Sequence, residues 1–189
     1  LEKKDQDSLE ALYAVDYIRP PVAPLTFVDH SDYCGHAGKD MFPAWRPYFD
    51  QINRPNSGIH ETIVTGAMGS GKTSVAMFTM AYKIYRVSLL KDPASFYGMQ
   101  ARSKIVFGLY ALTKTQIEDI GFYVLRDMLI DQSPYFAEVF PRSKHGKETM
   151  HWPLKHVHVI TGCLAEGTLI STPTGQVPIE TLADYPAVH

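Results

Sequence analysis

The feature that most constrains this chain is a glycine-rich run of eight residues: Gly66, Ala67, Met68, Gly69, Ser70, Gly71, Lys72 and Thr73. The run matches the pattern G-x-x-x-x-G-K-[ST] at every position. Glycines let the backbone turn tightly and present a row of N–H groups to phosphate oxygens, and a following helix adds its partly positive N-terminus. We therefore predict a phosphate-binding loop, or P-loop, at residues 66–73.

The segments on either side of the loop favour this interpretation. Residues 61–65 are rich in β-branched side chains and predict a strand. Residues 73–90 contain no Gly or Pro and predict a buried helix. In such a setting Lys72 reaches the β- and γ-phosphates of ATP as the catalytic cation, and the Thr73 hydroxyl ligates Mg²⁺. The alternative is a glycine-rich turn that binds nothing.

The rest of the chain predicts an α/β fold. Residues 104–109 and 156–160 predict two buried strands, and residues 115–131 predict an amphipathic helix that begins with a capping box of Thr115 and Glu118. The order strand, helix, strand, helix, strand is typical of a parallel sheet, here that of a P-loop NTPase. The sheet is expected to be incomplete, because no apolar run ending in an Asp-Glu pair follows the loop.

Composition excludes several classes of protein. Of 189 residues, 45% are hydrophobic and 20% are charged, which argues against disorder. No apolar run approaches the roughly 18 residues of a membrane span. The first residues lack the order of a secretory signal, so we expect a cytoplasmic location. A net charge of −2 gives no support to DNA binding by bulk charge. The cysteines Cys34 and Cys163 form no metal-ligand spacing, and a disulfide between them is not expected.

The composition changes at Cys163. Residues 163–189 contain three acidic residues and no Lys or Arg. Within this stretch an alternating strand, a Pro-Thr-Gly turn at residues 173–175 and a second short strand predict a β-hairpin. We therefore place a domain boundary between Gly162 and Cys163. The alternative for Cys163 is a buried free cysteine that opens an ordinary hairpin.

Residues 163–182 resemble the N-terminal splicing block of inteins, the first hairpin of an all-β Hint domain. The shared features are a leading Cys-Leu, Gly-Thr before an apolar strand, a glycine turn and a Pro-Ile-Glu-x-Leu ending. The resemblance implies that the Cys163 thiol attacks the Gly162 carbonyl carbon and forms a thioester. Inteins also carry a Thr-x-x-His block and a terminal His-Asn, and neither is present. The chain is then either a truncated precursor or one half of a split intein, and the remaining intein half is a partner.

Residues 40–162 resemble the ATPase domain of tailed-phage terminase large subunits. The resemblance is carried by the P-loop together with Phe42-Pro43, Trp45, Val-Phe-Gly-Leu-Tyr at 106–110, Thr-Lys-Thr-Gln at 113–116 and Ser-Pro-Tyr-Phe at 133–136. It implies an ATP hydrolase that packages double-stranded DNA together with a terminase small subunit and a portal protein. It also implies a location in the cytoplasm of an infected bacterial host and no membrane partner. The aromatic stretch 42–48 is expected to line the adenine pocket, with plain core packing as the alternative.

These observations divide the chain into an N-terminal arm at 1–40, a partial ATPase domain at 41–162 and an intein fragment at 163–189. The arm is expected to hold a short helix at 8–17 and an extended segment at Pro20, Pro21 and Pro24. One alternative is another P-loop DNA translocase or helicase-like ATPase that hosts an intein. Another is a self-processing Hint protein with no active ATPase. Two smaller alternatives stay open. The basic residues near the end of the ATPase segment either touch DNA phosphates or decorate a solvated loop: Arg142, Lys144, Lys147 and Lys155. A metal site at His156 and His158, or at Cys34 and His36, is the second alternative.

Overall fold

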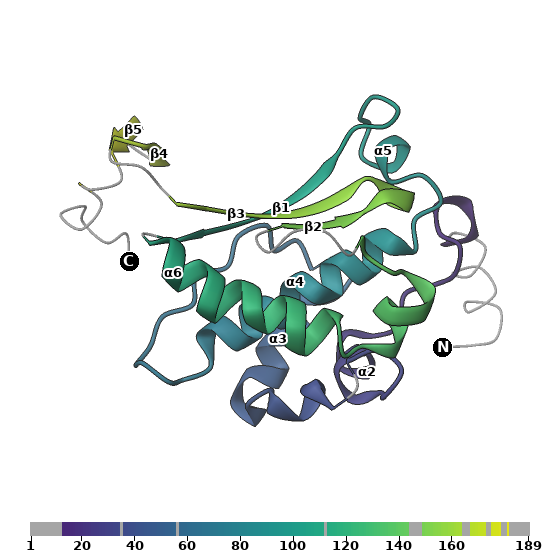
Figure 1. The fold of residues 1–189 in the computed structure, drawn as a ribbon, viewed down its shortest axis with the longest axis horizontal. Helices are drawn as coiled ribbons and strands as arrows, with labels where there is room; N and C mark the ends of the chain where they lie inside the picture. The colour runs from purple at the N-terminus through teal and green to yellow at the C-terminus, as the bar shows by residue number, and fades with distance from the viewer. Residues whose placement is uncertain are drawn as a thin grey trace.

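The fold is that of an α/β protein, with helices packed on one face of a small sheet. A computed structural model describes residues 13–34, 36–55, 57–111, 113–143, 149–163, 167–172, 175–178 and 181. Helices α3 (Arg46–Asn53), α4 (Lys72–Ser88) and α6 (Lys114–Gln116), with the turns that continue α6, lie on the same side of the sheet (Figure 1). The part of the chain that the structure describes contains no helix long and apolar enough to cross a membrane.

Helix α4 is the central element of the core. It begins at Lys72, directly after the glycine-rich loop, and ends at Ser88, close to the predicted bounds of 73–90. The side chains of Phe78, Tyr82, Ile84 and Tyr85 are at most 1% exposed. Their burial fixes the rotation of the helix, because exposing side chains of this size to water costs about 1.5–3 kcal/mol each. The first turn of α4 is thereby held in place at the end of the loop.

The sheet has the order β1-β3-β2 and is mixed. Strands β1 (Ile105–Ala111) and β3 (Val157–Cys163) pair in parallel, which confirms the two strands predicted at 104–109 and 156–160. Strand β2 (Thr149–Trp152) was not predicted and pairs with β3 in the antiparallel direction. Leu109, Val157 and Val159 point into the core, so Tyr110 and His158, one residue further along, point to the outer face.

The strand predicted at residues 61–65 is absent, and that prediction is wrong. Within the described part of the chain the segment pairs with no strand, and Ile63 is 80% exposed. A cavity of about 610 Å³ lies between Thr62 and Val64 on one side and the end of β1 on the other. Since β-branched residues favour a strand only where a neighbour supplies hydrogen bonds and packing, this run stays irregular without one.

The second long helix forms where it was predicted, with a different start. The α-helical turn α6 continues into two π-helical segments, η3 (Ile117–Phe122) and η4 (Val124–Ile130). The helix is capped by Thr113, whose Oγ1 accepts a hydrogen bond from the Gln116 N–H at 3.3 Å. The predicted capping box of Thr115 and Glu118 is wrong, because Thr115 lies inside the first turn.

Residues 13–34 and 36–40, which the sequence assigns to an arm, pack against helices α3 and α4. Residues 13–16 are helical, residues 18–23 are not, and helix α2 (Pro24–Asp29) begins at Pro24 itself. Proline suits the first position of a helix, where its missing N–H has no intrahelical partner to lose. Phe27 is fully buried against Tyr82 and Tyr85, with ring centroids 5.3 and 5.0 Å apart. Residues 1–12 lie outside the described part of the chain.

The Ser-Pro-Tyr-Phe segment that contributes to the terminase resemblance has a clear structural role. Ser133 is fully buried, and its Oγ accepts a hydrogen bond from the Phe136 N–H at the start of η5 (Tyr135–Val139). The Tyr135 hydroxyl lies 2.7 Å from Ser88 Oγ at the end of α4. The segment therefore ties the second long helix to α4. The remaining short helices are η1 (Ala37–Asp40), η2 (Pro43–Trp45), α5 (Pro93–Phe96) and η6 (Pro153–Lys155).

The predicted C-terminal hairpin is present. Strands β4 (Leu169–Thr172) and β5 (Gly175–Pro178) pair in the antiparallel direction, with Thr172 opposite Gly175. The turn residues Pro173 and Thr174 lie outside the described residues. The domain boundary predicted between Gly162 and Cys163 falls within β3, because that strand continues to Cys163.

Candidate functional site

The loop at residues 66–73 adopts backbone conformations that few residues other than glycine tolerate. Gly66, Gly69 and Gly71 have φ values of +145°, +77° and +81°. Gly71 is also the residue that precedes the first turn of α4, and its carbonyl accepts the Val75 N–H at 3.0 Å. The first turn of α4 has no acidic residue and no side-chain cap. Its N–H groups and partial positive charge are therefore directed at the space beside the loop.

Lys72 is folded back over this loop. Its Nζ donates to the carbonyl oxygens of Gly66 at 2.8 Å and Ala67 at 2.6 Å, and it lies 3.3 Å from Ser70 Oγ. An ammonium group at a helix start opposes the helix dipole, and these contacts compensate for that charge. The residues that the sequence assigns to phosphate binding are thus brought together around one cation. Met68 is fully exposed at the tip of the loop and makes no contribution to this cluster.

Two aromatic residues pack against the same loop from the other side. The indole Nε1 of Trp45 donates to the Ser70 carbonyl oxygen at 2.6 Å. A Cβ added at Gly71 would lie 2.9 Å from Phe42 Cδ2 and 3.2 Å from Trp45 Nε1. Phe42 and Trp45 therefore contact the loop itself. Their expected role in lining an adenine pocket stays a prediction.

The 610 Å³ cavity opens beside Lys72 and Thr73. Helix α4 forms its floor, and the residues Gly108, Leu109, Tyr110 and Ala111 of β1 form the facing wall. Thr73 is exposed, so its hydroxyl is accessible to a metal ion. Among the described residues that line this cavity, none is an Asp or Glu. The described lining accordingly presents the Lys72 ammonium group and the Thr73 hydroxyl but no carboxylate.

The junction between Gly162 and Cys163 lies at the end of β3. Gly162 is paired with Tyr110 and Cys163 with Ala111, and both partners also line the cavity beside Lys72. The two candidate sites are therefore joined through the last two residues of β1. The Cys163 thiol and residues 164–166 lie outside the described part of the chain, so its attack on Gly162 stays a prediction.

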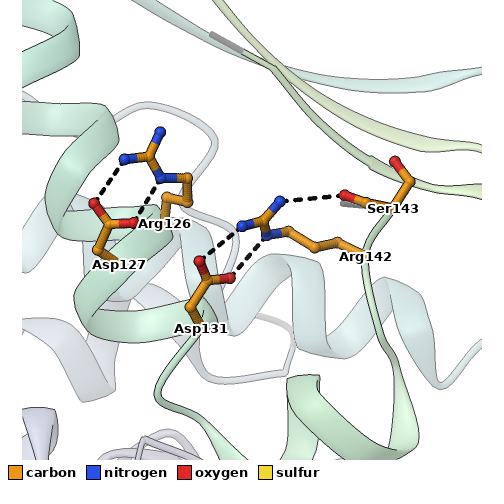
Figure 2. Close-up of polar contacts among 5 residues, drawn as sticks. All are labelled: Arg126, Asp127, Asp131, Arg142 and Ser143. Carbon is orange, nitrogen blue, oxygen red and sulfur yellow. Dashed lines mark hydrogen bonds and ion pairs between the residues drawn. The ribbon is translucent and has the colours of Figure 1, made fainter. Parts of the chain in front are cut away.

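Of the four basic residues considered for DNA binding, two are described, and both have intramolecular partners. Figure 2 shows the Arg142 guanidinium on the Asp131 carboxylate, with Nε–Oδ1 and Nη2–Oδ2 distances of 2.8 and 2.7 Å. Its Nη1 also donates to the Ser143 carbonyl oxygen at 3.2 Å. Lys155 Nζ donates to the Lys91 carbonyl oxygen at 2.9 Å, and burial lowers the pKa of Lys155. Lys144 and Lys147 lie outside the described residues.

Of the two histidines in the strand predicted at residues 156–160, His158 lies in β3 and His156 does not. His156 precedes β3 in a left-handed conformation with φ of +53°, so it does not alternate with His158 along the strand. His158 instead stacks on His151 of β2, with ring centroids 4.2 Å apart. Burial lowers the pKa of His158, and the nearby charges of His151, Lys104 and His156 lower it further. Across the described residues, no group of three or more His, Cys, Asp or Glu side chains is placed to hold a metal ion.

Cys34 is a free thiol in the core and only 1% exposed. Burial raises its pKa well above the ordinary value, and the nearby Asp29 carboxylate contributes in the same direction. A thiol held in this neutral form is a poor nucleophile and a poor metal ligand. Cys34 is thereby assigned to packing.

The contacts of Trp45 with Ser70 and of Tyr110 with Gly162 were not predicted from the sequence. Both contacts join segments 25 or more residues apart in the sequence, so the local sequence pattern carries no direct signal for them.

Comparison of the chain with known proteins found no matching family model, no matching curated protein and no matching solved structure.

Proposed function

We propose that residues 66–73 bind the phosphates of ATP, with Mg²⁺ held by Thr73. The observation that carries this proposal is the arrangement of Lys72 over a loop of positive-φ glycines at the uncapped start of α4. The loop N–H groups bind phosphate oxygens, and Lys72 exchanges its contacts with the Gly66 and Ala67 carbonyls for the β- and γ-phosphates. The charge-assisted contacts to phosphate replace weaker contacts to neutral carbonyls.

The same site binds ATP without hydrolysing it efficiently. Hydrolysis needs a carboxylate that orients water and completes the Mg²⁺ coordination, and the described lining of the cavity provides none. Two elements beside this cavity pair with no strand among the described residues on the sides that face it, namely the irregular segment 61–65 and the outer edge of β1. We propose that a strand carrying the acid follows the intein and pairs there. This chain is therefore one half of an ATPase site.

We propose that the complete host protein is a DNA-packaging ATPase of the terminase large subunit type. The order of Phe42 and Trp45, the P-loop, β1 and the Ser133 segment supports this proposal. Phe42 and Trp45 contact the loop at the start of α4, and Tyr135 contacts Ser88 at the end of α4. Double-stranded DNA, a small subunit and a portal protein are the partners that this assignment implies. Another P-loop DNA translocase is the second candidate, and a nuclease domain with acidic metal ligands in the completed protein decides between them.

We further propose that Cys163 begins an intein. The antiparallel pairing of β4 with β5 supports this part, because a hairpin follows the leading cysteine. The Cys163 sulfur attacks the Gly162 carbonyl carbon, a C–S bond forms, the C–N bond breaks and the thiol proton passes to the Cys163 nitrogen. Gly162 suits this step because it has no side chain to obstruct the tetrahedral centre.

Nucleotide binding is tested with a fluorescent ATP analogue in the presence of Mg²⁺. The wild-type chain is expected to bind it and to release it when unlabelled ATP is added. Lys72→Ala is expected to abolish binding, whereas Lys83→Ala, a change of the same charge on the same helix, leaves it intact. Equal affinity in the Lys72→Ala and Lys83→Ala variants contradicts the proposal.

Splicing is tested by expressing residues 1–189 together with the missing part of the intein and the host segment that follows it. Mass spectrometry is expected to show loss of the segment that begins at Cys163, and Cys163→Ala is expected to prevent that loss. Equal processing in wild type and Cys163→Ala contradicts the assignment. If the spliced product forms but neither binds nor hydrolyses ATP, the chain is a self-processing protein with an inactive ATPase segment.

A further inference from the structure

The ring of Tyr110 lies over two glycines on the outer face of the sheet. A Cβ added at Gly162 would lie 2.8 Å from Tyr110 Cε1 and 3.0 Å from Cδ1, and one added at Gly108 would lie 2.5 Å from Cε2. Gly108 precedes Tyr110 by two residues on β1, and Gly162 is its partner on β3. Because both positions are glycine, the ring can approach the backbone closely. The Tyr110 ring thereby covers backbone that has no side chain of its own, as aromatic residues do beside glycines in other sheets.

This ring is the nearest cover for the Gly162 backbone. The three atoms closest to a Cβ at Gly162 all belong to Tyr110. The helices α3, α4 and α6 lie on the opposite side of the sheet (Figure 1), so none of them covers this face. Tyr110 itself is 55% exposed, which shows that the ring lies at the surface with one side against the strand.

We propose that Tyr110 is a host-side positioning residue for splicing, which shields the Gly162 acyl group from water. This inference rests on the proposed splicing at Cys163. Once the thioester has formed, its carbonyl carbon has two competing fates. In splicing, a downstream hydroxyl or thiol attacks it and passes its proton to the Cys163 sulfur as the C–S bond breaks. In hydrolysis, water attacks instead, leaving a carboxylate on Gly162 and a free Cys163 thiol.

Excluding water from one side of a reactive acyl group suppresses hydrolysis without slowing attack by a nucleophile that the intein itself positions. The pairing of Gly162 with Tyr110 and of Cys163 with Ala111 also restricts the backbone on both sides of the scissile bond. The ratio of spliced product to hydrolysed fragment 1–162 therefore depends on Tyr110, a side chain outside the intein.

The test uses the precursor in which the rest of the intein and the host segment downstream of it follow residue 189, and it measures the ratio of hydrolysed fragment 1–162 to spliced product. Tyr110→Ala is expected to raise this ratio several-fold, and Tyr110→Phe, which keeps the ring, is expected to match wild type. Val106→Ala is the matched control, because Val106 is 51% exposed on the same face of the same strand. Melting temperatures of the three variants check that the fold is retained.

A double-mutant cycle separates shielding from a general effect on stability. Gly108→Ala leaves the scissile bond unaltered and is expected to displace the Tyr110 ring, because a Cβ there would lie 2.5 Å from Tyr110 Cε2. It is expected to raise the ratio on its own and to add little in the Tyr110→Ala background. A ratio that is unchanged in Tyr110→Ala, in a precursor that splices, overturns this inference and leaves the proposed splicing intact. A wild-type precursor that does not cleave at Gly162 overturns both.

Discussion

The indole Nε1 of Trp45 donates a 2.6 Å hydrogen bond to the carbonyl oxygen of Ser70, inside the glycine-rich loop. Ser70 is two residues before Lys72, and Gly71 between them contacts the Phe42 ring as well. This contact fixes one side of the loop to η2 (Pro43–Trp45), a segment that precedes it by 25 residues. The shape of the loop therefore depends on residues outside the motif.

Nucleotide binding is expected to change the fluorescence of Trp45. The chain has two tryptophans, and Trp152 is fully buried with its Nε1 on the Phe140 carbonyl oxygen, so it is remote from solvent changes at the loop. Trp45→Phe is expected to remove the ATP-dependent change and to weaken ATP binding roughly two- to tenfold, the effect of one net hydrogen bond. A full fluorescence change in Trp45→Phe contradicts this arrangement.

Gly71→Ala is expected to destabilise the fold more than Gly98→Ala does. Both glycines have positive φ, +81° and +63°, so each substitution carries the cost of a left-handed conformation, roughly 1–2 kcal/mol. A Cβ at Gly98 meets no atom within 4 Å, whereas one at Gly71 meets Phe42 and Trp45. Urea unfolding gives the difference in free energy of unfolding between the two variants, and this difference reports the clash of the added methyl group with the two aromatic rings. In the Phe42→Ala background the difference is expected to be smaller.

The Arg142–Asp131 pair is expected to stabilise the fold and to take no part in DNA binding. Arg142→Ala removes a two-point ion pair and is expected to lower the free energy of unfolding by about 1 kcal/mol. Adding Asp131→Asn to that variant is expected to cost little more, because the pair is already broken. A loss of DNA affinity at low salt in Arg142→Ala, with unchanged stability, contradicts this assignment.

The stacked histidines are expected to make stability depend on pH. The pKa of His158 is lowered in the folded state from its ordinary value of 6.5, so the unfolded chain takes up the proton first as the pH falls. The stability contributed by neutral His158 is therefore complete above about pH 6.5 and is lost as the pH decreases through the folded-state pKa. Unfolding by urea between pH 7.5 and 5 is expected to show a shallower loss of stability in His158→Phe than in wild type. Equal slopes contradict the prediction.

Local patterns predicted the elements whose signals are contiguous in the sequence. Helix α4, strands β1 and β3 and the hairpin of β4 with β5 were all predicted within a few residues. The conformation of the loop at residues 66–73 was also predicted, because the motif specifies both the glycines that take positive φ values and the position of Lys72. These features depend on periodicity and turn chemistry, which are encoded over short distances.

The errors have a common physical cause, which is dependence on distant partners. Residues 61–65 have the composition of a strand, but no described neighbour pairs with them. Strand β2 is four residues long and forms through its pairing with β3, so its own sequence gives little signal. Thr113 caps the second long helix two residues before the predicted cap, within the ordinary uncertainty of helix starts. The contacts of Trp45 and Tyr110 likewise require the assembled fold.

The central claim, that residues 66–73 form an ATP-binding half-site, is tested most directly by calorimetric titration of the wild-type chain with ATP and Mg²⁺. The account predicts saturable binding of one nucleotide per chain, and the nucleotide recovered afterwards should be ATP, since no acid lines the described cavity to activate water. Absence of saturable heat in a chain shown to be folded contradicts the account.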